Sequence, residues 1–253
     1  MPVITSTTTL VPDNPAAAYA AYRQATSAVF LAGTQGLKYK KDHYDLAVDL
    51  SKAGLTYIDE RADEIVIGAM TPLWQIKISQ AIQNFAGGAI SKAISDVADK
   101  NIQRYGTLGG VISSKAPFSV LLPILLSLHV DVQLQDKGCM SLDDYLHCPP
   151  MGELVTGISI AKEAVYTAYK AYRKLPVDEP YLVGAVAMRD DSWRIVVGGR
   201  PGLAAIARSA SEELDFGNFG TCSESERRAL TIEMVRSLIK SAWKGYNRYV
   251  VKK

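Results

Sequence analysis

Short apolar runs divide the first half of the chain into predicted strands. Residues 28–31, 46–50 and 64–68 each form a run of the length typical of a buried strand. Residues 130–134, with the sequence Val-Asp-Val-Gln-Leu, alternate apolar and polar side chains, which indicates a strand with one buried face. We therefore expect at least four strands before residue 150.

Helix start signals lie between these runs. Asn14 followed by Pro15 predicts a helix to about Ser27, because asparagine caps a helix and proline suits its first turn. Ser141, followed three residues later by Asp144, resembles a capping box. Further helices are expected at residues 71–78, with Thr71 as the cap, at 79–99, with a break at Gly87 and Gly88, and at 119–128.

The second half of the chain predicts an antiparallel arrangement. Strands are expected at residues 155–160, 181–189 and 193–197, with a hairpin turn at Asp190 and Asp191. Helices are expected at residues 201–213 and 223–246. Because the predicted pattern of strands and helices changes between the two halves of the chain, we expect a domain boundary near residue 150.

Residues 163–174 leave two interpretations open. Their propensities favour a helix. Val165, Thr167, Tyr169 and Ala171 also recur at every second position, which favours a strand.

Composition and charge exclude several classes of function. Of 253 residues, 48% are hydrophobic and 21% charged, which is typical of a globular protein. A net charge of +2 gives no electrostatic footprint for nucleic acid or an anionic membrane. No apolar run reaches the roughly 20 residues that span a bilayer, and the first ten residues have no features of a secretion signal. We expect a cytoplasmic protein.

The residues that commonly carry catalysis or metals are scattered. Cys139, Cys148 and Cys222 form no C-x-x-C motif, so neither a disulfide framework nor a metal site is expected. His43, His129 and His147 share no metal-ligand spacing, and none lies beside a nucleophile and an acid. We expect no catalytic residue and no metal ligand in this chain.

Residues 107–123 carry a resemblance to a known family. Their sequence, TLGGVISSKAPFSVLLP, is similar to the pattern T-[IL]-G-G-N-[IL]-x-x-x-S-P-x-x-D-x-x-P. That pattern is found in the FAD-binding subunits and domains of molybdenum hydroxylases, the xanthine dehydrogenase and CO dehydrogenase type. Four more stretches resemble the family in the same order, namely residues 30–33, 67–73, 172–175 and 223–235.

The resemblance implies the fold. The class would be α+β, with a two-subdomain FAD-binding fold of the vanillyl-alcohol-oxidase (PCMH) type. A C-terminal domain of three-stranded antiparallel sheet and helices would follow. The FAD-binding domain would span residues 1–150, with subdomains of about 1–55 and 56–150, and the C-terminal domain residues 151–253.

Two glycine segments are the predicted cofactor site. A glycine loop directly after a buried strand allows backbone N–H groups to approach a diphosphate closely. Two such loops would clamp a pyrophosphate from both sides, and neither is the Rossmann fingerprint. By resemblance, Lys174 would lie near the isoalloxazine ring. The predicted FAD-binding residues are Ala32, Gly33, Thr34, Gln35, Gly36, Leu37, Thr107, Gly109, Gly110, Ile112 and Lys174.

The sequence departs from the family at polar positions of these segments. Val111, Ala116 and Val120 stand where the family pattern has Asn, Ser and Asp. In the first loop, the family's second Gly, Thr and Asp are replaced by residues 34–36, Thr-Gln-Gly. The loss of two or three hydrogen bonds of about 0.5–1.5 kcal/mol each would weaken FAD binding by about ten- to a thousandfold.

The resemblance implies an oxidoreductase component rather than the substrate-hydroxylating subunit. Electrons would pass from [2Fe–2S] clusters of one partner subunit to FAD and on to an acceptor such as NAD. A molybdopterin-binding subunit would complete a xanthine dehydrogenase-like heterotrimer. One alternative is a non-catalytic structural subunit of the same fold that has lost tight FAD binding. Another is a free-standing flavin oxidoreductase, which the absence of an obvious substrate-domain insertion disfavours.

Overall fold

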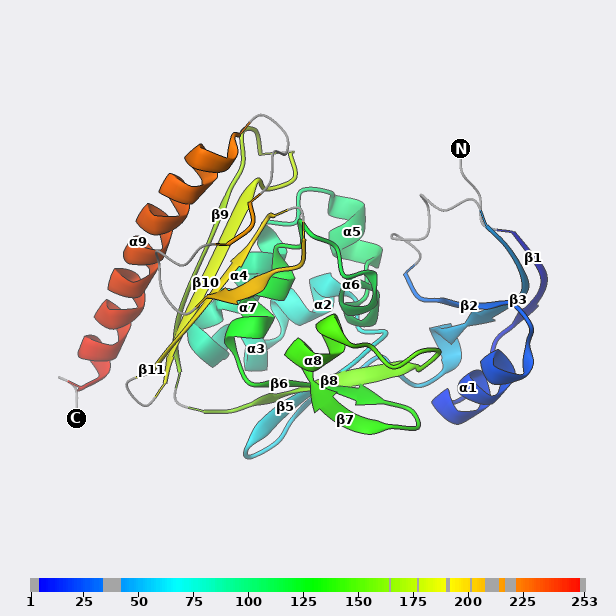
Figure 1. Ribbon diagram of the computed structural model, residues 1–253. Helices are drawn as coiled ribbons and strands as arrows, with labels where there is room; N and C mark the ends of the chain where they lie inside the picture. The colour runs from blue at the N-terminus through cyan, green and yellow to red at the C-terminus, as the bar shows by residue number, and fades with distance from the viewer. Residues whose placement is uncertain are drawn as a thin grey trace. The chain divides into compact units, whose positions relative to one another are not determined.

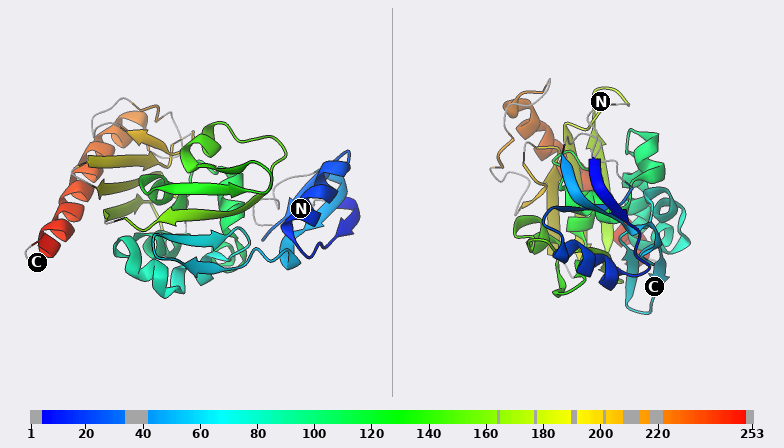
Figure 2. Two further views of the ribbon diagram at one scale, coloured as in Figure 1. Left: turned by 90° about the horizontal axis from the view of Figure 1, so that it is seen from below. Right: turned by 90° about the vertical axis from the view of Figure 1, so that its right-hand side faces the viewer.

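The computed structural model forms two compact units, which Figures 1 and 2 show as ribbons. Unit 1 consists of Met1–Ile76, Asn101–Ser114 and Val130–Ile160, and unit 2 of Lys77–Lys100, Lys115–His129 and Ala161–Lys253. Each unit therefore contains segments from both sides of residue 100. The structure describes residues 5–33, 42–163, 165–176, 178–189, 192–200, 202–207, 214–216 and 222–250.

The N-terminal part of unit 1 is a parallel sheet in the order β1-β3-β2. Its strands are β1 (Thr5–Leu10), β2 (Ala28–Leu31) and β3 (His43–Asp49), and its helices are α1 (Pro15–Gln24) and the 3₁₀ helix η2 (Leu50–Lys52). As expected, Asn14 caps α1, with its Oδ1 accepting from the Ala17 N–H at 2.8 Å. Ala18, Val48 and Leu50 form the core between helix and sheet.

The first strand was not predicted from the hydrophobic pattern. Five of the six residues of β1 are exposed, so the strand has no apolar face to reveal it. Its β-branched threonines nevertheless suit an extended backbone. Parallel pairing with β3, from Thr5 opposite His43 to Leu10 opposite Val48, holds it in the sheet.

The second sheet of unit 1 has five strands in the order β4-β5-β8-β6-β7. The strands are β4 (Ile58–Glu60), β5 (Glu64–Gly68), β6 (Val130–Leu134), β7 (Gly138–Ser141) and β8 (Val155–Ala161). Helices α2 (Leu73–Ile78), α5 (Lys100–Tyr105), α6 (Leu108–Ser114) and α8 (Leu142–His147) connect them. The central strand β8 lies beyond the boundary expected near residue 150, while its partners precede it.

Two local predictions in unit 1 have different outcomes. Ser141 caps α8 as expected, because its Oγ accepts from the Asp144 N–H at 3.1 Å. Thr71 does not cap α2. Its buried hydroxyl instead donates to the Tyr57 carbonyl at 2.9 Å and accepts from the Tyr57 N–H at 3.1 Å, which ties the two segments together.

The segment from Thr107 to Ile112 is helical, although its paired glycines predict a strand or turn from the sequence, so that prediction is wrong. Leu108–Ser114 form α6. The Thr107 side chain accepts from the Gly110 N–H at 3.2 Å, and the Thr107 carbonyl accepts from the Val111 N–H at 3.0 Å. Threonine at the first position thus caps the helix, which outweighs the poor helix propensity of the two glycines.

Unit 2 is built on an antiparallel sheet in the order β12-β11-β10-β9. Its strands are β9 (Tyr166–Tyr172), β10 (Leu182–Arg189), β11 (Ser192–Gly198) and β12 (Ala205–Ala207). The expected α+β class and C-terminal antiparallel sheet are confirmed, and β12 adds a short fourth strand. Of the two interpretations left open for residues 163–174, the strand is the correct one, because Tyr166–Tyr172 form β9.

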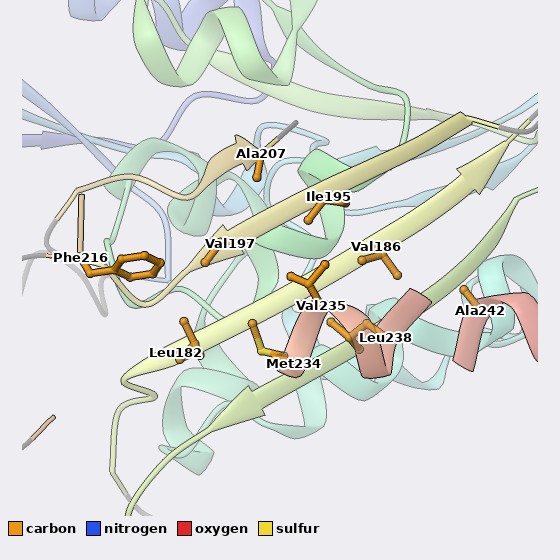
Figure 3. Packing of buried hydrophobic residues seen from close by; sticks show 10 residues of the cluster. All are labelled: Leu182, Val186, Ile195, Val197, Ala207, Phe216, Met234, Val235, Leu238 and Ala242. Atoms are coloured by element: carbon orange, nitrogen blue, oxygen red, sulfur yellow. The ribbon is translucent and has the colours of Figure 1, made fainter. Parts of the chain in front are cut away.

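Two helices cover opposite faces of this sheet, α7 (Leu121–Ser127) and α9 (Glu224–Val250). Leu182 and Val186 of β10 pack against Met234 and Leu238 of α9, as Figure 3 shows. Gly184 lies between them on the same face, where an added Cβ would come 2.5 Å from the Met234 Cε. The intervening residues of β10 therefore face α7.

Three helices complete the described part of unit 2, namely α3 (Gln80–Asn84), the 3₁₀ helix η3 (Phe85–Gly88) and α4 (Ala89–Ser95). The expected break at the glycine pair is present. Ala86, Gly87 and Gly88 all have positive φ, and the Thr167 hydroxyl of β9 donates to the Ala86 carbonyl at 2.5 Å. This hydrogen bond fixes a backbone conformation that alanine rarely adopts.

The predicted helix at residues 201–213 is wrong where the structure describes it. Ala205–Ala207 form β12, paired with Ile195–Val197 of β11. The unpaired edge of β11 offers hydrogen bonds that outweigh the helix propensity of alanine. Residues 208–213 and the expected turn at Asp190 and Asp191 lie outside the described residues.

The final helix agrees with its prediction. The Ser223 Oγ accepts from the Glu226 N–H at 3.3 Å, and the Glu226 carboxylate accepts from the Ser223 N–H at 2.8 Å, which is a reciprocal capping box. Backbone and side-chain hydrogen bonds from Ser223 lower the pKa of Glu226. Neither α9, at 27 residues, nor any other described helix is long and apolar enough to cross a membrane.

We expect Met234→Ala to destabilise unit 2 by about 2–5 kcal/mol, because it leaves a cavity between α9 and β10. Urea unfolding followed by circular dichroism measures the change. Lys240→Ala, on the exposed side of the same helix, is the control and should change the free energy of unfolding by less than about 0.5 kcal/mol. Equal effects of the two substitutions would contradict this packing.

Candidate functional site

The two predicted glycine segments meet within unit 1. Gly33 follows β2, and a Cβ built on it would overlap the carbonyl oxygen of Tyr105 and lie 3.3 Å from the Gly106 Cα. Any side chain at residue 33 would therefore push the segments apart. The start of the first predicted segment therefore lies against the two residues that precede the second, and we call this region the glycine junction (Ala32–Gly33 and Tyr105–Gly110).

Backbone hydrogen bonds anchor the second segment to the rest of unit 1. The Leu108 N–H donates to the Thr71 carbonyl at 3.1 Å, and the Gly109 N–H donates to the Ala69 carbonyl at 2.8 Å. With the Gly110 and Val111 N–H groups bonded to Thr107, the first four N–H groups of α6 are all used inside the protein. They are therefore not available to a ligand in this conformation.

The candidate residues of the second segment differ in how far they are buried. Thr107, Gly109 and Ile112 are buried, and a Cβ on Gly109 would lie 2.8 Å from the Ala69 Cβ. Gly110 is exposed, and Val111 is half-buried. Gly110 is therefore the predicted residue of this segment that reaches solvent, and its lack of a side chain leaves the surface open to close approach.

The other predicted cofactor residues are placed in part. Ala32 is half-buried beside Gly33. Lys174 lies exposed in the turn after β9, in unit 2, where the Leu175 N–H donates to the Asp178 carboxylate at 2.9 Å. Thr34, Gln35, Gly36 and Leu37 lie outside the described residues.

An exposed aromatic residue and an arginine lie next to the glycines of the glycine junction in the sequence. Tyr105 is 53% exposed, and the Arg104 guanidinium carbon lies 5.6 Å from the centre of its ring. This pair supplies an aromatic surface and a positive charge beside the glycines.

Val120 and Val111 are apolar residues of this chain at positions where the family pattern has polar ones, and the two differ in burial. Val120 is buried, with 6% exposure, directly before α7 in unit 2, so it contributes to a core. Val111 is half-buried on α6, where an asparagine would have access to solvent. Ala116, which stands where the family pattern has Ser, is exposed, so the substitutions at residues 111 and 116 both remove a polar group from an accessible surface.

A second polar cluster, in unit 2, was not found from the sequence. The Glu163 carboxylate accepts from His129 Nδ1 at 3.0 Å and forms an ion pair with Arg189. Arg189 Nη1 also lies 3.0 Å from His129 Nδ1, so the tautomer of His129 decides which bonds form. The three residues come from separate elements, up to 60 positions apart, and form no motif.

Electrostatics in this cluster favours the ionised carboxylate. Burial alone would raise the pKa of Glu163, but hydrogen bonds from Arg189 and His129 outweigh it, and the pKa of Glu163 is lowered. Within the described part of the chain, no group of three or more His, Cys, Asp or Glu residues is arranged to hold a metal ion. The cluster is therefore an ion-pair network.

Comparisons of sequence identify a family and a relative. The family model described as the FAD binding domain in molybdopterin dehydrogenase matches residues 5–162. The uncharacterized protein YgfM of Escherichia coli strain K12 is 29% identical over 180 residues, which cover 70% of this chain and 68% of that protein.

Comparisons of structure show the same fold over almost the whole chain. A carbon monoxide dehydrogenase from Hydrogenophaga pseudoflava, in a form lacking the Mo-pyranopterin moiety of its cofactor, has a TM-score of 0.82 and 20% identity, covering 96% of this chain and 99% of that one. Quinoline 2-oxidoreductase from Pseudomonas putida 86 has a TM-score of 0.78 and 17% identity, covering 96% and 98%.

We expect Gly33→Ala to lower the free energy of unfolding by about 1–3 kcal/mol, because the new methyl group overlaps the Tyr105 carbonyl. Chemical denaturation measures it. Gly202→Ala is the matched control, since an added Cβ there meets no atom within 4 Å and the backbone φ is not positive. A neutral Gly33→Ala would show that the two segments do not touch in solution.

The Glu163 cluster should stabilise the fold in a pH-dependent manner. A carboxyl whose pKa is lower in the folded than in the unfolded chain stabilises fully above the unfolded value, near 4.3, and loses this contribution as the pH falls through the folded value. We expect Glu163→Gln to cost at most about 1 kcal/mol at pH 7, after discounting for solvent screening, and almost nothing near pH 2.5.

Thermal unfolding between pH 2.5 and pH 7 tests this expectation for the cluster. Glu233→Gln, on the exposed side of α9, serves as the control. A cost of Glu163→Gln that grows as the pH falls would have the wrong sign for this network.

Proposed function

The chain belongs to the family of FAD-binding domains in molybdopterin dehydrogenases, and we propose that it is the flavin-binding, electron-transferring subunit of a multi-subunit molybdenum hydroxylase. The match over residues 5–162 carries this proposal. The contact between the two glycine segments supports it, because one ligand would touch both.

The residues of the chain would bind and orient the cofactor rather than act on a substrate. Gly33 and Gly110 allow a diphosphate to approach the backbone, and Thr107 holds α6 in the conformation that presents Gly110. Residues 34–37 are proposed to complete the first loop, and Lys174 to lie beside the ring system. When bound, FAD supplies the exchange between single-electron and two-electron transfer.

The source and the acceptor of the electrons are assigned to partners. An iron–sulfur cluster of the [2Fe–2S] type is held by four ligands, commonly all cysteine, whereas this chain supplies three widely spaced cysteines. We therefore place the clusters on one partner subunit and the molybdopterin on another, in a xanthine dehydrogenase-like heterotrimer. NAD is proposed as the final acceptor.

A structural role is the second candidate function. The first four N–H groups of α6 are bonded within the protein, and Val111 replaces the polar residue of the family on an accessible surface. Both observations reduce the hydrogen bonds available to FAD. A subunit of this kind would stabilise the hydroxylase without holding a flavin.

Absorbance of the purified chain, before and after addition of FAD and removal of the excess, separates the two functions. Retention of about one FAD per chain is the result expected for the electron-transfer subunit. A protein that is colourless, both alone and when co-expressed with its iron–sulfur and molybdopterin partners, would contradict the electron-transfer role and support the structural one.

We expect Val111→Asn to bind FAD about two- to tenfold more tightly, because it restores one polar contact of about 0.5–1.5 kcal/mol. Quenching of flavin fluorescence gives the dissociation constant. Val11→Asn, which places the same group on an exposed position after β1, should leave the constant unchanged. A similar gain in both variants would mean that the effect does not arise at the glycine junction.

A further inference from the structure

A buried threonine, Thr71, lies among the contacts that hold the second glycine segment in unit 1. Its residue is 0% exposed, and its hydroxyl bonds both backbone groups of Tyr57, the residue before β4. The Thr71 carbonyl accepts from the N–H of Leu108, the first residue of α6, at 3.1 Å. One residue therefore connects the segment that precedes β4 to the start of α6.

The next two residues extend this contact to the glycine junction. Pro72 and Thr107 form an antiparallel bridge, and the Leu73 N–H donates to the Gly106 carbonyl at 2.9 Å. Gly106 also lies against Gly33, since a Cβ built on Gly33 would come 3.3 Å from the Gly106 Cα. The residues just before α6 are therefore held by two separate parts of unit 1.

The hydroxyl of Thr71 satisfies a backbone group of Tyr57. The Tyr57 carbonyl accepts from the Gly68 N–H at 3.0 Å as well as from the threonine, so it keeps one partner without the hydroxyl. The Tyr57 N–H, which is partly buried, donates to the Thr71 Oγ1 at 3.1 Å. Valine has the shape of threonine but cannot accept this hydrogen bond. An unsatisfied N–H costs free energy, which favours a shift of the backbone around residue 71.

We propose that Thr71 is a positioning residue of the cofactor site, whose hydroxyl keeps the residues before α6 in place against Gly33 and thereby sets the affinity for FAD. Because Thr71 is buried, it acts without touching the cofactor, through its own carbonyl and through Pro72 and Leu73. This inference rests on the proposed function of the chain.

Thr71→Val tests the proposal, because it removes the hydroxyl at nearly constant volume. We expect the full chain to bind FAD about three- to tenfold more weakly, as measured by quenching of flavin fluorescence. The visible circular dichroism of the bound flavin, which reports its orientation, should change as well. Thr71→Ser keeps the hydroxyl and should restore both the affinity and the spectrum. A role in stability alone would alter neither quantity well below the unfolding temperature.

Hydrogen exchange without FAD tests the structural link by itself. In Thr71→Val the Leu108 N–H should exchange faster, because its acceptor is displaced. The increase should exceed that of the Val132 N–H, which lies in the buried part of β6. A general loss of stability would instead accelerate both amides to a similar degree.

Thr231→Val is the matched control. Thr231 is 4% exposed, and its hydroxyl donates to the Arg227 carbonyl within α9, in unit 2. The same substitution there removes a buried hydroxyl that has no bond to the glycine junction. It should leave the dissociation constant and the flavin spectrum as they are in the natural chain.

The outcomes separate this inference from the proposed function. A natural chain that binds no FAD, alone or with its partners, would overturn both. Equal FAD affinity in the natural chain and in Thr71→Val would overturn this inference alone. The same holds for a loss of affinity that Thr71→Ser does not restore, and for equal acceleration of exchange at Leu108 and Val132.

Discussion

The close contact between Gly33 and the Tyr105–Gly106 backbone is the constraint on which the candidate cofactor site depends. Seventy or more residues separate the two segments, and no side chain fits between them. Glycine at residue 33 therefore has a steric reason that is independent of any ligand. The same absence of a side chain would admit the diphosphate that we propose there, so one residue would serve both the fold and the proposed site.

The second segment shows that residues of a family motif can have structural roles of their own. Threonine caps α6, Gly109 packs on Ala69, and the early N–H groups are bonded internally. These features explain the retention of Thr107 and Gly109 without reference to a cofactor. Val111 has no such structural reason, because its position is accessible to solvent.

Much of the fold and the family could be predicted from the sequence, because the signals are local. The caps at Asn14 and Ser141 and the apolar strands β2 and β5 depend on neighbouring residues. The family and its cofactor, FAD, could also be predicted, from motifs in the right order. These predictions are confirmed.

The errors occur where distant residues decide the outcome. β1 is held by pairing with β3, β12 by the edge of β11, and α6 by bonds to Ala69 and Thr71. The cluster of His129, Glu163 and Arg189 is assembled by the end of α7 and the β10–β11 hairpin. No short window of sequence contains these contacts.

The position of β8 has a consequence for the order of synthesis. This strand completes the five-stranded sheet between β5 and β6, so a nascent chain that has emerged only to residue 150 holds two half-sheets with facing unpaired edges. The fold of unit 2 likewise cannot form until β10 and α9 have been synthesised, although its first helices precede residue 100 in the chain. Closing loops of this length is slow, so the unpaired edges of β5 and β6 stay exposed to edge-to-edge association until β8 has been made.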